Sequence, residues 1–339
     1  MVHKQDGPIV AAKGLTKEFQ IFKSRPGLMG AIRDLFNREH MMVNAVNHID
    51  LLIQPGEIVG YIGSNGAGKS TTIKMLTGIL MPTSGNLSVN GMVPYENREA
   101  FVRTIGVVFG QRSQLWWDIA VRESFELLRK VYRVPLERYQ PHMAHIIETL
   151  DLEELLDKPV RKLSLGQRMR CELAASLVHN PRLLFLDEPT IGLDVMVKLR
   201  IREFLKEMNE QYGTTIMLTT HDIGDIEALC SRVVMLDKGN IIYDGTLSEL
   251  RAKWAGERAV RVSFADRVKM ESLHRIFVEQ PVVIQRNHEL EYEFLLKDPS
   301  YSLSNLMTQL AAQFQVRDLA MIETSTEEIV RHIYEGGRA

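Results

Sequence analysis

The feature that most constrains the fold of this chain is the segment 63–70, whose sequence is GSNGAGKS. It fits the pattern G-x-x-x-x-G-K-[S/T]. Residues 57–62, before it, predict a short buried strand, and residues 71–78, after it, have the apolar spacing of a helix. A strand that turns through glycines into a helix directs backbone N–H groups and the positive end of the helix dipole at an anion. The segment therefore predicts a phosphate-binding loop.

Individual residues of this loop have distinct expected roles. The glycines permit positive φ angles and a close approach of the backbone to phosphate. Lys69 is expected to reach the β- and γ-phosphates of a nucleotide, and the Ser70 hydroxyl to ligate Mg²⁺. A chance glycine-rich turn is the alternative, but the flanking strand and helix argue against it.

Composition narrows the classes of protein to which the chain can belong. Its 339 residues allow one large domain and a small one, and its net charge of −2 argues against a dedicated nucleic-acid-binding protein. No apolar run reaches the roughly 18 residues that span a membrane, and residues 1–6 lack the apolar core of a signal peptide. These features predict a cytoplasmic protein. The two cysteines, Cys171 and Cys230, fall in segments predicted as helical and are expected to be buried free thiols.

The N-terminal part, up to about residue 60, has a β-rich pattern, with strands predicted at 8–12 and 47–53. Between them, the polar stretch 23–42 carries apolar residues at helical spacing. These residues are Leu28, Ile32, Leu35 and Phe36. A small helix packed on the edge of the domain is the ordinary interpretation. Since arginines and a histidine flank that apolar face, a contact with a membrane surface or a partner is the alternative.

The middle of the chain changes from a helical pattern to strand–helix alternation. Helices are predicted at 121–132 and 139–150. Two short apolar strands, 183–186 and 215–218, then flank a helix at 198–212. Apolar strands separated by helices are typical of a parallel sheet covered on both faces.

Near residue 253 the pattern changes again and predicts a small separate α+β domain over residues 253–339. Its expected elements are a strand, a helix, a hairpin of two strands, a helix, a strand and a helix. They are predicted at 259–264, 268–277, 282–286, 291–296, 303–314, 318–322 and 327–334. These segments contain enough apolar residues for a small core of their own.

Candidate catalytic residues follow the predicted strands. Asp187 and Glu188 come directly after the strand 183–186, and ligands of such sheets bind at the carboxyl ends of the strands. Phosphoryl transfer to water needs a metal ion and a base that orients the water. Asp187 is therefore a candidate for holding Mg²⁺ through water, and Glu188 for orienting the attacking water. A buried strand that simply ends in two acids is the alternative for this segment taken alone.

Three further polar residues have both an ordinary and a functional interpretation. Ser164 precedes a predicted helix, which it can cap, and the N-terminus of that helix is also an anion site. Gln111 follows the predicted strand 105–109 and, taken alone, is typical of a solvated loop. His221 follows the strand 215–218 closely, at a position where a lone histidine is more often structural than catalytic.

The order of these segments removes the ordinary alternatives. A phosphate loop, a loop glutamine, LSLGQ, LDEPT and TTHD follow one another along about 160 residues. Over residues 8–250 the chain strongly resembles the ATP-binding subunit of an ABC transporter. The resemblance implies an α/β fold, the P-loop NTPase of ABC type, with a β-rich nucleotide subdomain and a helical subdomain at about 112–178. It also implies that the small C-terminal α+β domain, 253–339, is accessory or regulatory.

The resemblance further implies a mechanism. ATP is expected to lie between the phosphate loop of one subunit and the LSLGQ segment of the other, in a head-to-tail homodimer that hydrolyses ATP with Mg²⁺. Glu188 is the implied catalytic base, and His221 contacts the γ-phosphate. Ser70, Gln111 and Asp187 are the implied metal-site residues, with Gln111 also sensing the γ-phosphate. The implied nucleotide-binding residues are Phe19, Gly63, Ser64, Asn65, Gly66, Ala67, Gly68, Lys69, Ser70, Thr71, Ser164, Gly166, Gln167 and Asp194.

Two positions distinguish this chain within the family pattern. Leu165 stands where the usual LSGGQ has its first glycine, so the backbone donors survive but the dimer must accommodate a side chain. The aromatic residue that stacks on adenine normally lies well before the phosphate loop. Phe19 is the first candidate for that position and Phe22 is the second.

Within the family, residues 111–117 (QRSQLWW) and 190–194 (TIGLD) resemble ATPases paired with type-2 ABC permeases, which are usually exporters. Trp116 and Trp117 are candidates for a groove that receives a permease coupling helix, or for packing within the helical subdomain. A single ATPase unit without membrane spans implies separate permease subunits and a place on the cytoplasmic face of the membrane. An importer ATPase and an ABC-type ATPase that does no transport are the alternatives.

Overall fold

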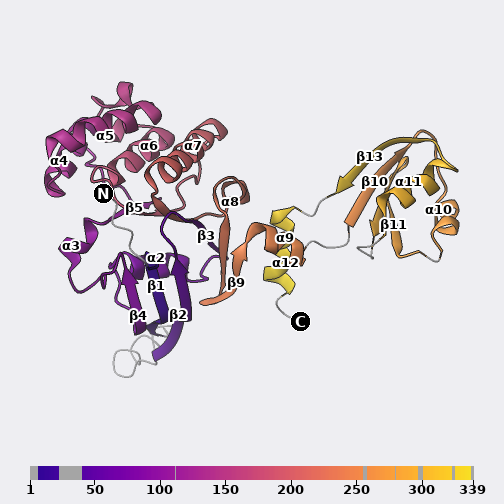
Figure 1. Ribbon diagram of the computed structural model, residues 1–339, viewed down its shortest axis with the longest axis horizontal. Helices are drawn as coiled ribbons and strands as arrows, with labels where there is room; N and C mark the ends of the chain where they lie inside the picture. Colours follow the sequence, from indigo (N-terminus) through magenta and orange to yellow (C-terminus); the bar gives the residue numbers. More distant parts are fainter. Residues whose placement is uncertain are drawn as a thin grey trace, which may run out of the picture. The chain divides into compact units, whose positions relative to one another are not determined.

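The computed structural model describes residues 7–22, 40–110, 112–254, 258–278, 280–296, 301–322 and 325–336 (Figure 1). The chain folds into two compact units, Met1–Leu247 and Ser248–Ala339. Among the helices of these described ranges, none combines the length and the apolar character that crossing a membrane requires.

The first unit is built on a six-stranded sheet. Its strands are β3 (Ile58–Gly63), β5 (Ile105–Phe109), β6 (Leu183–Asp187), β7 (Thr215–Thr219), β8 (Arg232–Asp237) and β9 (Asn240–Thr246). They lie in the order β5-β6-β7-β3-β8-β9, and all neighbours are parallel except the antiparallel pair β8 and β9. The predicted buried parallel strands are confirmed, because β3 and β7 are buried along their whole length.

A second, antiparallel sheet has the order β2-β1-β4. Its strands are β1 (Val10–Phe22), β2 (His40–Ile53) and β4 (Ser84–Val89). β1 and β2 extend well beyond the predicted 8–12 and 47–53, because their pairing continues as far as Phe22 and His40. The far part of this hairpin is exposed, so it lacks the apolar alternation that marks a half-buried strand. The predicted helix carrying Leu28 and Phe36 lies outside the described residues.

One hydrophobic cluster joins the two sheets through the helix α2 (Lys69–Leu76). Fully buried members include Leu15 of β1, Ile53 of β2, Ile73 of α2 and Phe185 of β6. In Figure 1, α2 accordingly lies between β1, β2 and β4 on one side and the six-stranded sheet on the other. The helix that begins at the predicted phosphate loop is thus packed on both sides.

The opposite side of the six-stranded sheet carries a group of helices (Figure 1). They are α4 (Val121–Val131), α5 (Leu136–Thr149), α6 (Leu165–Ser176) and α7 (Val195–Tyr212). In α4, Val121, Phe125 and Leu128 recur at helical spacing and are buried, as an amphipathic surface helix requires. α6 is buried over most of its length, and both α4 and α5 contact it. The shorter helices α3 (Arg98–Val102) and α8 (Ile223–Leu229) complete this unit.

The second unit contains a four-stranded antiparallel sheet with the order β11-β12-β10-β13. Its elements, in chain order, are β10 (Arg258–Phe264), α10 (Met270–Ile276), β11 (Val282–His288), β12 (Glu291–Leu296), α11 (Leu303–Ala311) and β13 (Val316–Ile322). This β-α-β-β-α-β order is that of the ferredoxin-like motif. The six predicted elements are confirmed, and Phe264, Phe294, Leu273 and Leu306 form a core between the sheet and its two helices.

The helices at the two ends of this second unit contact each other. They are α9 (Leu247–Trp254) and α12 (Thr326–Gly336). The Arg251 guanidinium on α9 donates hydrogen bonds of 3.0 and 3.1 Å to the Thr326 hydroxyl on α12. The predicted C-terminal helix is therefore present, and it packs on a helix that the sequence pattern did not indicate.

Both cysteines are free and buried, as predicted. Cys171 lies within α6, but Cys230 is the residue directly after α8, with an extended backbone, so its predicted helical position is wrong by one residue. Burial raises the pKa of the Cys171 thiol to about 12 and that of Cys230 also well above its usual range. Neither thiol is therefore set up as a nucleophile.

Candidate functional site

The carboxyl ends of four parallel strands bring the phosphate loop, the two predicted acids and the segment of His221 to one edge of the six-stranded sheet. Phe109 of β5 pairs with Asp187 of β6, and Asp187 pairs with Thr219 of β7. β3 lies beside β7 and ends at Gly63, where the glycine-rich loop begins. In parallel sheets this edge is where ligands bind.

The glycine-rich loop leads into an open helix end. Gly68 is the N-cap of α2 and has a φ of +109°, and no side chain caps this described terminus. A Cβ atom on Gly68 would lie 2.4 Å from the carbonyl oxygen of Ala45, so only glycine fits between the loop and β2. The N–H groups of the first turn of α2 are therefore left to bind an anion.

Lys69 is folded back across this loop and is 7% exposed. Its ammonium group donates hydrogen bonds of 2.6 Å to the carbonyl oxygen of Gly63 and 3.2 Å to that of Ser64. Burial lowers the pKa of Lys69, and the carboxylates of Glu188 and Asp187 oppose this shift. The lysine and the two acids thus lie within electrostatic reach of one another, around the space in front of α2.

Thr219 organises the two acidic residues. Its hydroxyl donates a 2.6 Å hydrogen bond to the Asp187 carboxylate, and its carbonyl oxygen accepts a 3.0 Å hydrogen bond from the Glu188 N–H. Glu188 has a φ of +56°, a left-handed conformation that is unusual for a residue other than glycine. Gly110 lets the end of β5 approach this turn, since a Cβ there would lie 2.9 Å from the carbonyl oxygens of both acids.

His221 lies directly against the second acid. Its Nε2 atom is 2.9 Å from Oε1 of Glu188, and its side chain is 45% exposed. His221 therefore differs from a buried structural histidine, because it is partly exposed and contacts a carboxylate near the phosphate loop. Gln111 lies outside the described residues, so its predicted roles stay predictions. Its neighbour Arg112 turns back on β5, donating a 3.0 Å backbone hydrogen bond to Phe109.

The LSLGQ segment contains the N-cap of α6, and the predicted capping role of Ser164 is confirmed. The Ser164 hydroxyl accepts a 3.2 Å hydrogen bond from the Gln167 N–H, and the Gln167 side chain accepts one of 3.0 Å from the Ser164 N–H. A Cβ on Gly166 would lie 3.2 Å from the Val197 side chain, so glycine lets α6 approach α7 closely. Asp194 caps α7 in the same way, by accepting a 3.0 Å bond from the Val197 N–H.

Leu165, which departs from the family pattern, lies over the loop that precedes α7 in the same chain. Its Cδ2 atom is 3.2 Å from where a Cβ of Gly192 would be, and its side chain is 42% exposed. Other exposed apolar residues lie in the same loop before α7 and in the first turns of α7. They are Ile191 (49% exposed), Val195 (71%), Met196 (74%) and Leu199 (43%). The ends of α6 and α7 therefore present apolar side chains to solvent.

Comparisons with known proteins agree with this geometry. The family model described as "ABC transporter" matches residues 46–191. The ABC transporter ATP-binding protein NatA of Bacillus subtilis is 29% identical over 215 residues, which cover 63% of this chain and 87% of that protein. The daunorubicin/doxorubicin resistance ATP-binding protein DrrA of Streptomyces peucetius is 29% identical over 287 residues, 84% of this chain and 86% of that protein.

A solved structure of a dimeric ATP-binding cassette, in a post-hydrolysis state bound to ADP and Pi, aligns with a TM-score of 0.59 and 26% identity. The alignment covers 70% of this chain and 98% of the cassette. This chain belongs to the ABC transporter ATP-binding proteins. It binds ATP and is an ATPase, and the expected ABC-type P-loop fold is confirmed.

The adenine-stacking candidate of this ABC ATPase lies on β1. Phe19 is 37% exposed, pairs with Val43 of β2, and has the Lys17 ammonium 5.4 Å from its ring centroid. Phe19 thus lies on the outer part of β1, beyond Thr16, where the pairing of β1 with β4 ends. The side chain of Phe22 lies outside the described residues, so the choice between the two phenylalanines stays a prediction.

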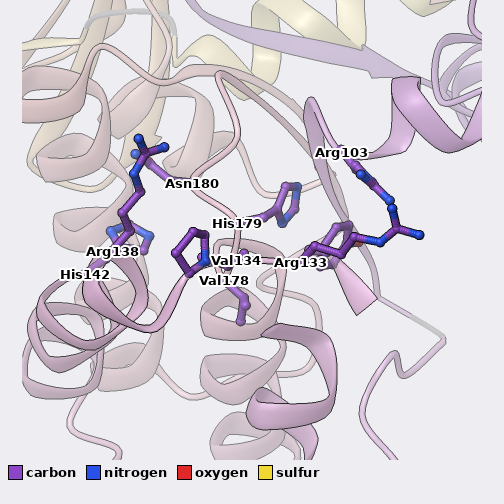
Figure 2. A pocket seen from close by; sticks show the side chains of 10 residues that line it. Arg103, Arg133, Val134, Arg138, His142, Val178, His179 and Asn180 are labelled. Atoms are coloured by element: carbon purple, nitrogen blue, oxygen red, sulfur yellow. The ribbon is translucent and has the colours of Figure 1, made fainter. Parts of the chain in front are cut away.

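A pocket of about 320 Å³ lies at the other, amino-terminal edge of the ABC ATPase sheet (Figure 2). Arg103 precedes β5 and Asn180 precedes β6, and both line the pocket. Figure 2 shows the side chains of Arg103 and Arg133 meeting, and both approach Glu99, at 2.8 and 3.7 Å. Because it lies at the opposite edge of the sheet, this pocket is separate from the nucleotide site.

Sequence reasoning missed the threonines that hold the site together. Thr219, Thr220 and Thr190 all bond side-chain carboxylates at the carboxyl edge. Their only signal in the sequence was the position directly after a buried strand or after the two acids. A hydroxyl residue in such a place is easily taken for an ordinary loop residue, because its partner is distant in the chain.

Proposed function

We propose that this chain powers export through separate type-2 permease subunits, by hydrolysing ATP with Mg²⁺ as a head-to-tail homodimer. The observation that carries the proposal is the gathering of Lys69, Asp187, Glu188 and His221 around one open helix end. The resistance and multidrug names of its relatives favour export over the importer and non-transport alternatives.

In this proposal the loop residues 63–71 hold the phosphates, with Lys69 moving its ammonium from the loop carbonyls to the β- and γ-phosphates. The Ser70 hydroxyl and the Asp187 carboxylate would hold Mg²⁺ together with phosphate oxygens and Gln111. Hydroxyl and carboxylate oxygens are the ligands that Mg²⁺ prefers, and the ion supplies neutralisation of charge on the phosphates.

Glu188 is the proposed base, because it lies beside the open loop and has an exposed histidine as its partner. Its carboxylate would accept a proton from the attacking water while the Thr219 backbone holds it in place. His221 would contact the γ-phosphate from its place beside Glu188, so that the two side chains orient the water and the phosphate together.

The head-to-tail homodimer is proposed from the way α6 and α7 end. Ser164, Gly166, Gln167 and Asp194 are placed at helix N-termini, which attract phosphate. They are accompanied by exposed apolar residues, of which Met196 is 74% exposed. A second copy that brings its ATP to this surface would bury those apolar side chains and complete both nucleotide sites, with Phe19 stacking on adenine.

Permease subunits are the proposed membrane partners, which would place the ATPase peripherally on the cytoplasmic face of the membrane. Trp116 and Trp117 are 43% and 52% exposed, and the Arg168 guanidinium lies 5.8 Å from the Trp117 ring centroid. Aromatic side chains of this kind are favoured anchors in protein interfaces.

We assign residues 8–250 to the ATPase domain and residues 253–339 to an accessory or regulatory domain.

The proposal is tested by expressing this chain with multi-span membrane proteins encoded beside it and preparing inside-out vesicles. The chain should associate with one of them, and its ATPase activity should rise in the vesicles. Lys69→Ala should abolish hydrolysis but keep the association, and paired Trp116→Ala and Trp117→Ala should weaken the association. A chain that binds none of these membrane proteins, and gains no activity from them, would contradict the transport part of the proposal.

A further inference from the structure

One fully buried carboxylate binds side chains from three segments of the proposed nucleotide site. Asp225 lies on α8 and is 0% exposed. Its Oδ2 atom accepts a hydrogen bond from the Thr190 hydroxyl and another, of 3.0 Å, from the Thr220 hydroxyl. Its Oδ1 atom accepts a 2.7 Å hydrogen bond from Nε of Arg202 and forms an ion pair of 2.5 Å with Nη2 of the same side chain.

These partners come from the parts of the chain that carry the proposed chemistry. Thr190 follows Glu188 by two residues, and Thr220 directly precedes His221. Arg202 lies on α7, the helix that begins at Asp194. One carboxylate therefore links the loop of the catalytic acid, the loop of the histidine and the helix that begins at the proposed dimer surface.

We propose that Asp225 is a positioning residue that keeps Glu188 and His221 in contact and ties both to α7. It acts through the two threonine hydroxyls, because it touches neither the acid nor the histidine in any hydrogen bond of the described residues. The inference rests on the catalytic roles proposed for Glu188 and His221. No sequence pattern pointed to it, since an aspartate four residues after a histidine reads as a solvated helix residue.

The physical argument is that a buried charge is retained only where it is paired and fully hydrogen-bonded. Arg202 balances the charge of Asp225, which leaves Oδ2 free to hold two hydroxyls with charge-assisted bonds. Two loops anchored to one oxygen atom cannot separate without breaking a bond. The 2.9 Å contact between Glu188 and His221 is then fixed by the fold before ATP binds.

A second link between the same two helices makes the proposal testable without unfolding the chain. Lys198 on α7 lies 2.5 Å from Asp222, the N-cap of α8, and Arg202 lies 3.6 Å from it. α7 and α8 therefore stay joined when a threonine bond to Asp225 is lost. Asp225→Ala, by contrast, leaves Arg202 buried without its partner and is expected to unfold the helix pair.

The test uses Thr190→Val and Thr220→Val in the full chain, with Thr77→Val as the matched control. Valine keeps the volume of threonine and removes only the hydroxyl. Thr77 is as buried as Thr190, at 2% exposed, but its hydroxyl bonds the Ile73 carbonyl oxygen within α2. Thr190→Ser and Thr220→Ser keep the hydroxyl and serve as rescues.

We expect kcat for Mg-ATP to fall roughly tenfold or more in each valine variant, while KM stays within about threefold, because misplacing catalytic groups affects the chemical step. Thr77→Val should keep kcat, and both serine variants should recover most of it. The double variant should lose little more than either single one, since breaking one link already frees the contact. Thermal unfolding should show similar small changes in all three valine variants.

Two outcomes separate this inference from the proposed function. If Glu188→Gln is inactive but Thr190→Val and Thr220→Val retain the kcat of Thr77→Val, the positioning role of Asp225 is wrong and the proposed function stands. If Glu188→Gln hydrolyses ATP at the wild-type rate, the catalytic assignment itself fails. Losses in the two valine variants that simply add in the double variant would also contradict a shared action through Asp225.

Discussion

The helices α2 and α6 each begin at a segment predicted to contact phosphate, yet the chain completes these two N-termini in opposite ways. At α2 the N-cap is a left-handed glycine, and no described side chain occupies the terminus. At α6 the Ser164 hydroxyl accepts a hydrogen bond from the Gln167 N–H, and the Gln167 side chain accepts one from the Ser164 N–H. One chain thus contains an uncapped helix N-terminus at the phosphate loop and a second N-terminus that carries a side-chain cap, which a nucleotide held by another copy must approach from outside.

The largest effect is expected at the α2 side of this contrast. Glu188→Gln removes the base beside the open terminus without changing its shape, so ATP should still bind. Hydrolysis should fall by about 10²–10⁴, as is usual when a general base is lost. Phosphate release at saturating Mg-ATP measures the effect, and nucleotide binding by fluorescence provides the control. Turnover at the wild-type rate would show that another group orients the water.

The next effect concerns the α6 side. Ser164→Arg places bulk and positive charge at the capped terminus, so the ATP-dependent association of two chains should be lost. Ser164→Thr keeps the capping hydroxyl and is the matched control. Light scattering with and without Mg-ATP, both in the Glu188→Gln background, measures the association. An unchanged ATP-dependent dimer in Ser164→Arg would mean that the α6 terminus does not close the site.

A smaller effect is expected on the stability of the fold, and it comes from His179, which follows the C-terminal end of α6. Burial lowers the pKa of His179 to about 4, and its Nε2–H donates a 2.9 Å hydrogen bond to the Ile105 carbonyl oxygen. The unfolded chain binds a proton near pH 6.5 and the folded chain does not, so stability is full above pH 6.5 and falls as the pH drops towards 4. The free energy of unfolding should be about 2 kcal/mol lower at pH 5 than at pH 7.5.

Urea unfolding at the two pH values measures this difference. His179→Phe keeps a ring to stack on Tyr132, whose ring centroid lies 3.9 Å away, but cannot be protonated. It should show a clearly smaller pH dependence than the wild type. Burial also lowers the pKa of His142, so part of the dependence should remain in the variant. An equal dependence in both proteins would rule out His179 as its source.

The smallest effect is expected from removing the second unit. A chain that ends at Leu247 keeps both helix termini and every proposed site residue. Its affinity for ATP should stay within about threefold, whereas the rate of hydrolysis or of export is free to change. Nucleotide titration of the shortened chain, with circular dichroism to verify its fold, tests the domain division. Loss of ATP binding in a folded chain would place part of the nucleotide site beyond residue 247.

The sequence predicted those parts of the molecule whose signal is local. The phosphate loop, the buried strands and the seven predicted elements of the C-terminal part all followed from apolar spacing and glycine positions. It did not predict the full length of β1 and β2, because their outer halves pair with each other in solvent rather than against a core. The left-handed conformation of Glu188 and the close approach of Gly110 to it were not predicted either, since both depend on contacts between strands.

The same limit applies to the site. The residues Lys69, Asp187, Glu188 and His221 were proposed as site residues because the motifs that contain them follow one another in the order of a known family. The bonds that arrange them, through Thr219 and Asp225, join segments 30 or more residues apart or depend on helix packing. Hydrogen bonds between distant hydroxyls and carboxylates leave no periodic pattern in a sequence.

The most direct test of the central claim is the mass of Glu188→Gln in solution with Mg-ATP. If the open terminus of one chain and the capped terminus of another enclose each nucleotide, the variant should be a dimer with two ATP molecules in Mg-ATP. It should return to a monomer when the nucleotide is removed. A mass that is independent of nucleotide, or a dimer that holds no ATP, would contradict the account.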